Sequence, residues 1–277
     1  MDRLGTVFDH FTLSARVFFS GRLCGISSDH DTNSAGHLHV LRSGSIAVAQ
    51  PGLEGIVVCE PSVLFFPRPL QHRFESNSEG AEIVCAYIDF GAGILQTLLH
   101  SLPSMMQIPL RLSPELGRGA DLLFEEAFGG LPGRQAAVDR LAEYLLVLIL
   151  RDALEKEMVK TGILHGLADE RLTKALLAMH QQPEESWDLY RMSSAAGMSR
   201  ARFAAHFRNI VGTTPMNYLA AWRMGIVQSM LRKSVPLKSI APAVGYESST
   251  ALTRAFTQTI KQSPTEWLAS NRFQPRA

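Results

Sequence analysis

The C-terminal third of the 277-residue chain contains an internal repeat, and this repeat constrains the fold more than any other feature. In both copies the second large apolar residue precedes a proline by 8 positions, and an aromatic-Leu pair follows that proline after two residues. Agreement at so many landmarks predicts a duplicated structural unit. The landmarks are Gly197-Met198-Ser199, Phe203, Phe207, Pro215 and Tyr218-Leu219 in the first copy, and Gly245, Ser248, Leu252, Phe256, Pro264 and Trp267-Leu268 in the second.

Each copy predicts a helix-turn-helix. A short helix, about residues 189–196 or 237–244, would end at a glycine that can adopt a positive φ. Ser199 or Ser248 would then cap a second helix. In a helix-turn-helix this second helix enters the major groove of DNA. A helical hairpin repeat without DNA-binding function stays open as the alternative.

The charge distribution favours a nucleic-acid partner for this repeat. From Leu167 onward there are 14 Lys and Arg against 7 Asp and Glu, whereas the first 166 residues hold 13 and 19, although the whole chain has a net charge of only +1. A basic region attracts DNA phosphates, and the acidic region is expected to have a different partner.

Helical periodicity predicts which side chains face DNA. If Phe203 and Phe207 point inward, Ala201, Ala205 and Arg208 lie on the opposite face of the first recognition helix. Arg254 is the strongest candidate for reading a base, because arginine can form two hydrogen bonds with guanine. The residues expected to contact DNA are Arg200, Arg202, Arg208, Lys238, Ser239, Ser249, Thr250, Arg254 and Thr257.

The first 110 residues are expected to be rich in short strands. Runs such as Leu38–Leu41 and Ile83–Phe90 are separated by Gly and Pro, a pattern typical of a small barrel or a double-sheet roll. Helices are expected from Ser113 to Gly129 and from Ala136 to about Met158. The second helix has a wide apolar stripe, which fits either a buried core helix or a dimer interface.

Composition excludes several other classes of protein. The longest apolar run, Leu145–Leu150, is too short for a membrane span, and the N-terminus lacks the pattern of a signal peptide. Three cysteines are an odd number and do not indicate a disulfide framework, so a cytoplasmic location is expected.

The repeat closely resembles the AraC/XylS family of bacterial transcription regulators. The resemblance runs from Trp187 to Trp267 almost without gaps. One position departs from the family pattern: Lys261 stands where the family usually has glycine, two residues before the closing Ser-Pro. The matching motifs are Gly197-Met198-Ser199, Gly212-Thr213-Thr214-Pro215, Arg223, Ile240-Ala241, Val244-Gly245-Tyr246-Glu247-Ser248 and Ser263-Pro264.

The resemblance continues upstream and implies a cupin domain that senses a signal. The implied fold class is α+β: a β-rich cupin-like barrel followed by helices, then an all-α domain with two helix-turn-helix units. The expected domains are a sensor at 1–110, a helical and dimerising segment at 111–160, a linker at 161–170 and the DNA-binding domain at 171–277. The upstream motifs are Leu38-His39, Pro67 with His72, Val84-Cys85, Leu102-Pro103, Asp139-Arg140-Leu141-Ala142, Gly166 to Arg171 and Ala178-Met179-His180.

Three histidines are candidate sensor residues. His37 and His39 would share one face of a strand, and His72 follows a proline turn. The pattern is similar to that of metal cupins, but the glutamate such sites usually add is missing. No cofactor is therefore expected, and an organic effector is favoured over a metal at His37, His39 and His72. A metal-dependent cupin enzyme with an accessory helical domain is the alternative from another functional class.

Cys24 and Cys85 offer a second candidate signal. Some regulators of the resembled subgroup carry cysteines at similar positions and respond to oxidants such as reactive chlorine species. The hypothesis is a switch through a Cys24–Cys85 disulfide, against the alternative of inert buried cysteines. The expected partners are double-stranded promoter DNA, a small-molecule effector or oxidant, RNA polymerase and a second copy of the chain.

Overall fold

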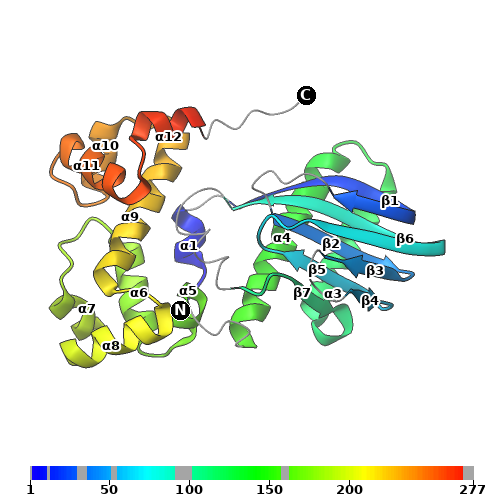
Figure 1. Ribbon diagram of the computed structural model, residues 1–277, viewed down its shortest axis with the longest axis horizontal. Coiled ribbons are helices and arrows are strands. Elements are labelled where there is room, and N and C mark those ends of the chain that lie inside the picture. The colour runs from blue at the N-terminus through cyan, green and yellow to red at the C-terminus, as the bar shows by residue number, and fades with distance from the viewer. Residues whose placement is uncertain are drawn as a thin grey trace. The chain divides into compact units, whose positions relative to one another are not determined.

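The computed structural model describes residues 2–10, 13–29, 36–50, 55–90, 102–156 and 162–270. The chain forms two compact units (Figure 1). The sheet unit comprises Leu13–Phe90 and Leu102–Met158. The helical unit comprises Met1–Thr12, Gly91–Ser101 and Val159–Ala277.

A curled seven-stranded sheet forms the body of the sheet unit. The strands run in the order β4-β3-β6-β2-β5-β7, and β1 pairs with the long strand β6 off this path. All pairings are antiparallel. Along one edge β6 pairs with β1, and along its other edge its first part pairs with β3 and its later part with β2. The strands are β1 (Ser14–Asp29), β2 (Gly36–Ser43), β3 (Ile46–Ala49), β4 (Ile56–Val58), β5 (Ser62–Phe66), β6 (His72–Asp89) and β7 (Met106–Pro109).

Two helices, α3 (Pro114–Gly129) and α4 (Arg134–Glu155), follow a 3-10 turn, η1 (Leu110–Leu112), and pack against each other and the sheet. The wide apolar stripe of α4 is buried, including Leu145, Leu146 and Ile149. Burying each such side chain stabilises the folded unit by roughly 2 kcal/mol. The core-helix interpretation therefore accounts for the stripe without a partner chain.

The helical unit contains α5 (Ile163–Ala168), α6 (Leu172–Gln181) and the repeat. The first copy supplies α7 (Leu189–Ala195) and α8 (Arg200–Val211), and the second supplies α10 (Leu237–Ala243) and α11 (Ser249–Ile260). The 18-residue helix α9 (Pro215–Arg232) connects the two copies, and α12 (Pro264–Ser270) closes the unit.

Two short helices differ from the predicted organisation. Residues 5–10 form α1 (Gly5–His10), which packs against α6 in the helical unit, although a β-rich sensor was expected there. Residues 163–168 form α5, with Ile163, Leu164 and Leu167 buried, inside the expected linker 161–170. Both segments are too short to show helical periodicity clearly, and their apolar contacts with the rest of the unit fix them.

Among the described residues, no helix is long and apolar enough to cross a membrane.

Candidate nucleic-acid interface and sensor cavity

The two turns of the repeat have the geometry that the glycines predicted. Gly197 has φ +63° and Gly245 has φ +75°, a region that only glycine adopts without strain. Ser248 caps α11, because its hydroxyl accepts a hydrogen bond from the Ala251 amide at 3.2 Å. Ser199 occupies the same position before α8, but its side chain forms no capping bond, contrary to the prediction.

The faces of the two recognition helices also follow the predicted periodicity. Phe203 and Phe207 of α8 are fully buried, as are Leu252 and Phe256 of α11. The opposite faces are exposed in both helices. The exposed residues of the predicted set are Arg200, Arg202, Arg208, Lys238, Ser239, Thr250, Arg254 and Thr257, and Ser249 is partly exposed.

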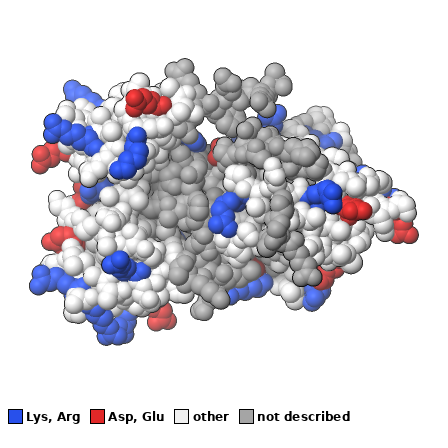
Figure 2. Space-filling model, viewed as in Figure 1, with Lys and Arg blue, Asp and Glu red and all other residues white. Residues whose placement is uncertain are grey.

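Basic side chains on these exposed faces are not engaged by neighbouring carboxylates. Within the described part of the chain, the side chains of Arg200, Arg208 and Arg254 form no ion pair or hydrogen bond. The side chain of Arg191, away from the recognition helices, pairs with Glu185 at 3.0 Å. Figure 2 shows Lys and Arg side chains on the surface of the helical unit, over both copies of the repeat. Unpaired guanidinium groups on an exposed helix face are available for an anionic polymer such as DNA.

Two other predicted contacts have distinctive surroundings. Arg202 lies at the flank of α8, where it lines a hollow together with Asp169, Arg171 and His206. A flanking position suits a phosphate contact better than a base contact. The Thr257 hydroxyl donates to the Thr253 carbonyl at 2.9 Å, so it retains acceptor capacity and a methyl group toward the outside.

Arg223 fastens the two copies of the repeat to each other. Its Nε donates to the Pro183 carbonyl at 2.7 Å and its Nη2 to the Glu185 carbonyl at 2.9 Å. Its guanidinium also lies 5.8 Å from the centre of the Tyr246 ring, in the turn of the second copy. Arg223 on α9 thus joins the loop before α7 to the turn before α11.

Lys261, which stands where the family usually has glycine, has a strained backbone conformation. Lys261 ends α11 with φ +65°, where a residue with a side chain costs about 1 kcal/mol more than glycine. The family preference for glycine at this position therefore has a backbone cause.

A buried histidine in the helical unit was not predicted as a structural centre. His180 stacks on Trp222 at 3.6 Å, and its Nε2 lies 2.5 Å from the Tyr218 hydroxyl. Its Nδ1 lies 3.4 Å from the Thr6 hydroxyl of α1. Burial raises the pKa of Tyr218 well above 10.0, so the phenol stays protonated and donates to His180. This network attaches α1 to α6 and α9.

The three predicted sensor histidines do meet on one face of the sheet. The ring centres of His37, His39 and His72 are 4.9 to 5.9 Å apart. His72 Nδ1 lies 2.8 Å from the Leu70 carbonyl, and its Nε2 lies 2.9 Å from His39 Nε2. His72 also stacks on Phe66 at 4.1 Å. The cluster is a hydrogen-bonded aromatic layer, and no group of described His, Cys, Asp or Glu residues is arranged to hold a metal ion.

Burial makes this layer sensitive to pH. Desolvation, followed by the neighbouring His72 and His37, lowers the pKa of His39 well below 6.5. As the pH falls below about 6.5, unfolded chains bind a proton that the folded state rejects, so stability falls by up to about 1.4 kcal/mol per pH unit. Urea unfolding of the sheet unit at pH 7.5, 6.0 and 5.0 should show this loss. His39→Leu should flatten the profile, and an unchanged profile in that variant would contradict the assignment.

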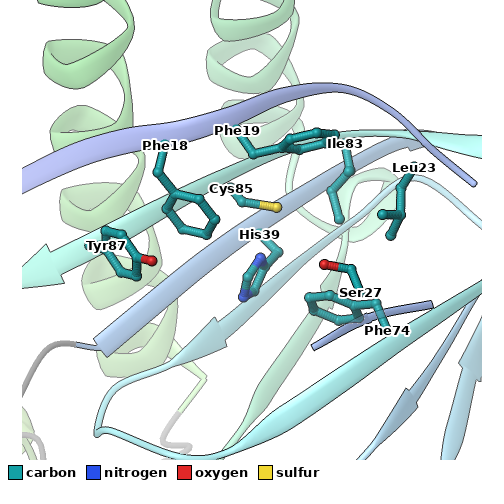
Figure 3. A pocket seen from close by; sticks show the side chains of 9 residues that line it. All are labelled: Phe18, Phe19, Leu23, Ser27, His39, Phe74, Ile83, Cys85 and Tyr87. Carbon is teal, nitrogen blue, oxygen red and sulfur yellow. The ribbon is translucent and has the colours of Figure 1, made fainter. Parts of the chain in front are cut away.

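A cavity of about 230 Å³ lies beside the histidine layer, and sequence reasoning missed most of its walls (Figure 3). A bulge in β1, between Val17 and Phe19, turns both Phe18 and Phe19 toward it. Adjacent apolar residues on an otherwise alternating strand were the signal that could have indicated the bulge. The lining residues are Phe18, Phe19, Leu23, Ser27, His39, Phe74, Ile83, Cys85 and Tyr87.

The strand register separates the two cysteines of the predicted switch. Cys85 on β6 is opposite Phe19 on β1, whereas Cys24 follows five residues later on β1, about 16 Å along the strand. A disulfide needs Cα atoms within about 7 Å. The predicted Cys24–Cys85 disulfide is therefore wrong for this fold of the sheet unit. Cys85 is buried against the cavity, and Cys24 is exposed.

Comparison with known families agrees with both units. The cupin family matches residues 2–155, and the helix-turn-helix domain family matches residues 192–270. Together these matches cover the curled sheet with its helices and nearly all of the repeat.

Three relatives are described as transcription regulators. An uncharacterized HTH-type transcriptional regulator of Haemophilus influenzae is 32% identical over 72% of this chain and 66% of its own length. An AraC-like transcription regulator of Streptomyces antibioticus is 33% identical over 64% of this chain and 60% of its own. The RCS-specific HTH-type transcriptional activator RclR of Escherichia coli is 28% identical over 88% of this chain and 90% of its own. The chain thus spans 66% and 60% of the lengths of the first two relatives. It belongs to the AraC-type helix-turn-helix transcriptional regulators with an N-terminal cupin domain.

Proposed function

We propose that the protein binds double-stranded promoter DNA through α8 and α11, and that a small molecule bound in the cavity of the sheet unit controls this binding. The observation that carries the DNA-binding part is the pair of exposed recognition faces whose arginines have no carboxylate partners within the described residues. On the opposite side of each helix, a pair of buried apolar side chains anchors the helix to its unit. These pairs are Phe203 with Phe207 in α8 and Leu252 with Phe256 in α11.

The geometry of the repeat favours two contacts on one side of DNA. The 18 residues of α9 span about 27 Å, which is close to the roughly 34 Å of one DNA helical turn. We infer that two recognition helices joined by a connector of this length enter successive segments of the major groove. Arg254 is proposed to read a base in one segment, while Arg202 and Lys238 contact phosphates.

Selection of binding sites from random double-stranded DNA tests this proposal. The full chain should enrich one sequence, and its affinity for that sequence should fall roughly 10³-fold between about 50 and 200 mM salt, because several counterions are released on binding. Failure to enrich any sequence, or an affinity independent of salt, would overturn the proposal.

Oxidant-dependent control is a second candidate function. It is supported by the match to a relative named as an RCS-specific activator over 88% of this chain, and by the position of Cys85 at the cavity. Hypochlorous acid would convert the Cys85 thiol to a sulfenic acid with release of chloride and a proton. Cys85→Ser should then abolish the response of a reporter promoter to hypochlorous acid, while Cys24→Ser should leave it intact. A normal response in both variants would remove this candidate.

A further inference from the structure

We propose that the effector is an uncharged, mainly aromatic small molecule with one hydroxyl or amine group, and that this group donates a hydrogen bond to Nδ1 of His39. The inference rests on the proposed function, since it names the chemical class of the molecule that would occupy the same cavity. It is carried by the size of the cavity, the chemistry of its walls and the hydrogen-bond direction within the histidine layer.

The size and walls of the cavity favour an aromatic occupant. A cavity of roughly 150 Å³ lined by apolar side chains holds benzene, so about 230 Å³ is enough for a two-ring molecule. Phe18, Phe19, Phe74 and Tyr87 supply four aromatic rings around it (Figure 3). Phe18 stacks on Tyr87 at 4.1 Å. Aromatic rings pack well against such walls in offset and edge-to-face arrangements.

The walls also disfavour a charged occupant. None of the nine described lining residues is Lys, Arg, Asp or Glu. His39 does not supply a positive charge at neutral pH either, because burial lowers its pKa well below 6.5. A carboxylate entering this cavity would lose its hydration without gaining a counter-charge, which costs several kcal/mol.

The hydrogen bonds within the histidine layer determine whether Nδ1 of His39 is a donor or an acceptor. The Leu70 carbonyl only accepts, so His72 Nδ1 carries a proton and donates to it. A second proton on His72 would place a charge in an apolar surrounding, so His72 Nε2 accepts from the Nε2–H of His39. The remaining nitrogen of His39, Nδ1, is then an acceptor.

This acceptor has no hydrogen-bond partner in the part of the chain that the structure describes. His39 Nδ1 is buried, while the His39 ring forms part of the cavity wall. Leaving a buried acceptor without a partner costs about 1–3 kcal/mol, which a ligand donor would recover. A hydroxyl or amine on an aromatic ring supplies that donor without introducing a charge.

Two of the phenylalanines that line the cavity are partly accessible to solvent. Phe18 and Phe19 are 43% and 36% exposed, respectively, which is high for phenylalanines that line a cavity. Both are placed there by the bulge in β1, where the regular ladder with β6 is interrupted. Occupation of the cavity would cover part of these two rings and stabilise the sheet unit.

Three probes of similar shape test the inference on the full chain. Naphthalene has no donor, 2-naphthol has one and 2-naphthoate carries a charge. Equilibrium dialysis at pH 7.5 should give the tightest binding for 2-naphthol, about 3- to 10-fold tighter than for naphthalene. Binding of 2-naphthoate should be at least about 10-fold weaker than that of naphthalene. Equal or tighter binding of 2-naphthoate would overturn the inference.

Variants then test the assigned acceptor. His39→Leu should reduce the affinity for 2-naphthol to that for naphthalene and change the affinity for naphthalene by less than about 2-fold. Tyr87→Phe is the matched control and should keep the preference for 2-naphthol. Ser27→Phe, at an exposed position of the rim, should weaken both probes and provides a test that leaves the histidine layer intact. Preference for 2-naphthol that survives in His39→Leu, or undiminished binding in Ser27→Phe, would overturn the assignment.

The DNA experiment separates this inference from the proposed function. If the wild-type chain enriches a DNA sequence but binds the probes in the wrong order, only the inference fails. If the probe order is as expected but no DNA sequence is enriched, the proposed function fails and the ligand class stands.

Discussion

Gly245→Ala is expected to lower the free energy of unfolding of the helical unit by about 2–5 kcal/mol and to abolish tight DNA binding. Gly245 has φ +75°, so any side chain costs about 1–2 kcal/mol there. An added Cβ would also lie 2.5 Å from the Glu184 carbonyl oxygen and 2.8 Å from Arg223 Nη2. The forced shift adds about 1–3 kcal/mol and displaces the residues that join the two copies of the repeat.

Gly197→Ala is the matched control, because Gly197 holds the same place in the first copy. Its φ is +63°, but an added Cβ would have no neighbour within 4 Å. The expected cost is therefore only the backbone strain, about 1–2 kcal/mol. Urea unfolding of both variants measures the difference. Equal losses in the two variants would show that the contact with Glu184 and Arg223 does not constrain the turn.

Arg254→Ala is expected to reduce discrimination at one base pair of the selected DNA site by about 1–3 kcal/mol, a factor of roughly 5 to 150. Arg254 is exposed on α11, directly opposite the buried pair Leu252 and Phe256. A two-hydrogen-bond contact with guanine specifies that base, so its loss should make the four bases nearly equivalent at that position. Competition binding with single-base variants of the site measures this effect.

Arg202→Ala serves as the contrasting variant for a phosphate contact. It should weaken binding to all sequences by a similar factor and reduce the dependence on salt by about one counterion. If Arg254→Ala behaved in this uniform way, Arg254 would be a phosphate contact and the predicted reading face of α11 would be wrong.

The helical unit could be predicted from the sequence in most of its detail. Helices expected at 189–196 and 237–244 are observed at Leu189–Ala195 and Leu237–Ala243. Local signals determine these elements: a glycine at each turn, an apolar pair four residues apart, and Ser248 as a helix cap. What the sequence did not reveal is the role of Arg223, since backbone carbonyls as partners leave no pattern in side chains.

The sheet unit could be predicted only in outline. The runs at Leu38–Leu41 and Ile83–Phe90 were recognised because Gly and Pro separate them, and they lie in β2 and β6, but β7 and most of β1 were not predicted. Strand alternation places His37 and His39 on one face of β2, whereas the approach of His72 depends on how the strands pack. The cavity was missed because it depends on the bulge at Phe18, and the separation of Cys24 from Cys85 depends on strand register. The adjacent apolar residues of β1 are a signal for a bulge, but its position and the strand register are decided by tertiary packing.

Protection of the selected DNA site from hydroxyl radicals tests the central claim most directly. The account predicts two protected segments on one side of the duplex, about one helical turn apart, because the two recognition helices that α9 connects are proposed to enter successive segments of the major groove. Arg254→Ala should weaken protection of one segment while the other remains. A single protected segment, or uniform protection along the duplex, would contradict the claim that both copies of the repeat read promoter DNA.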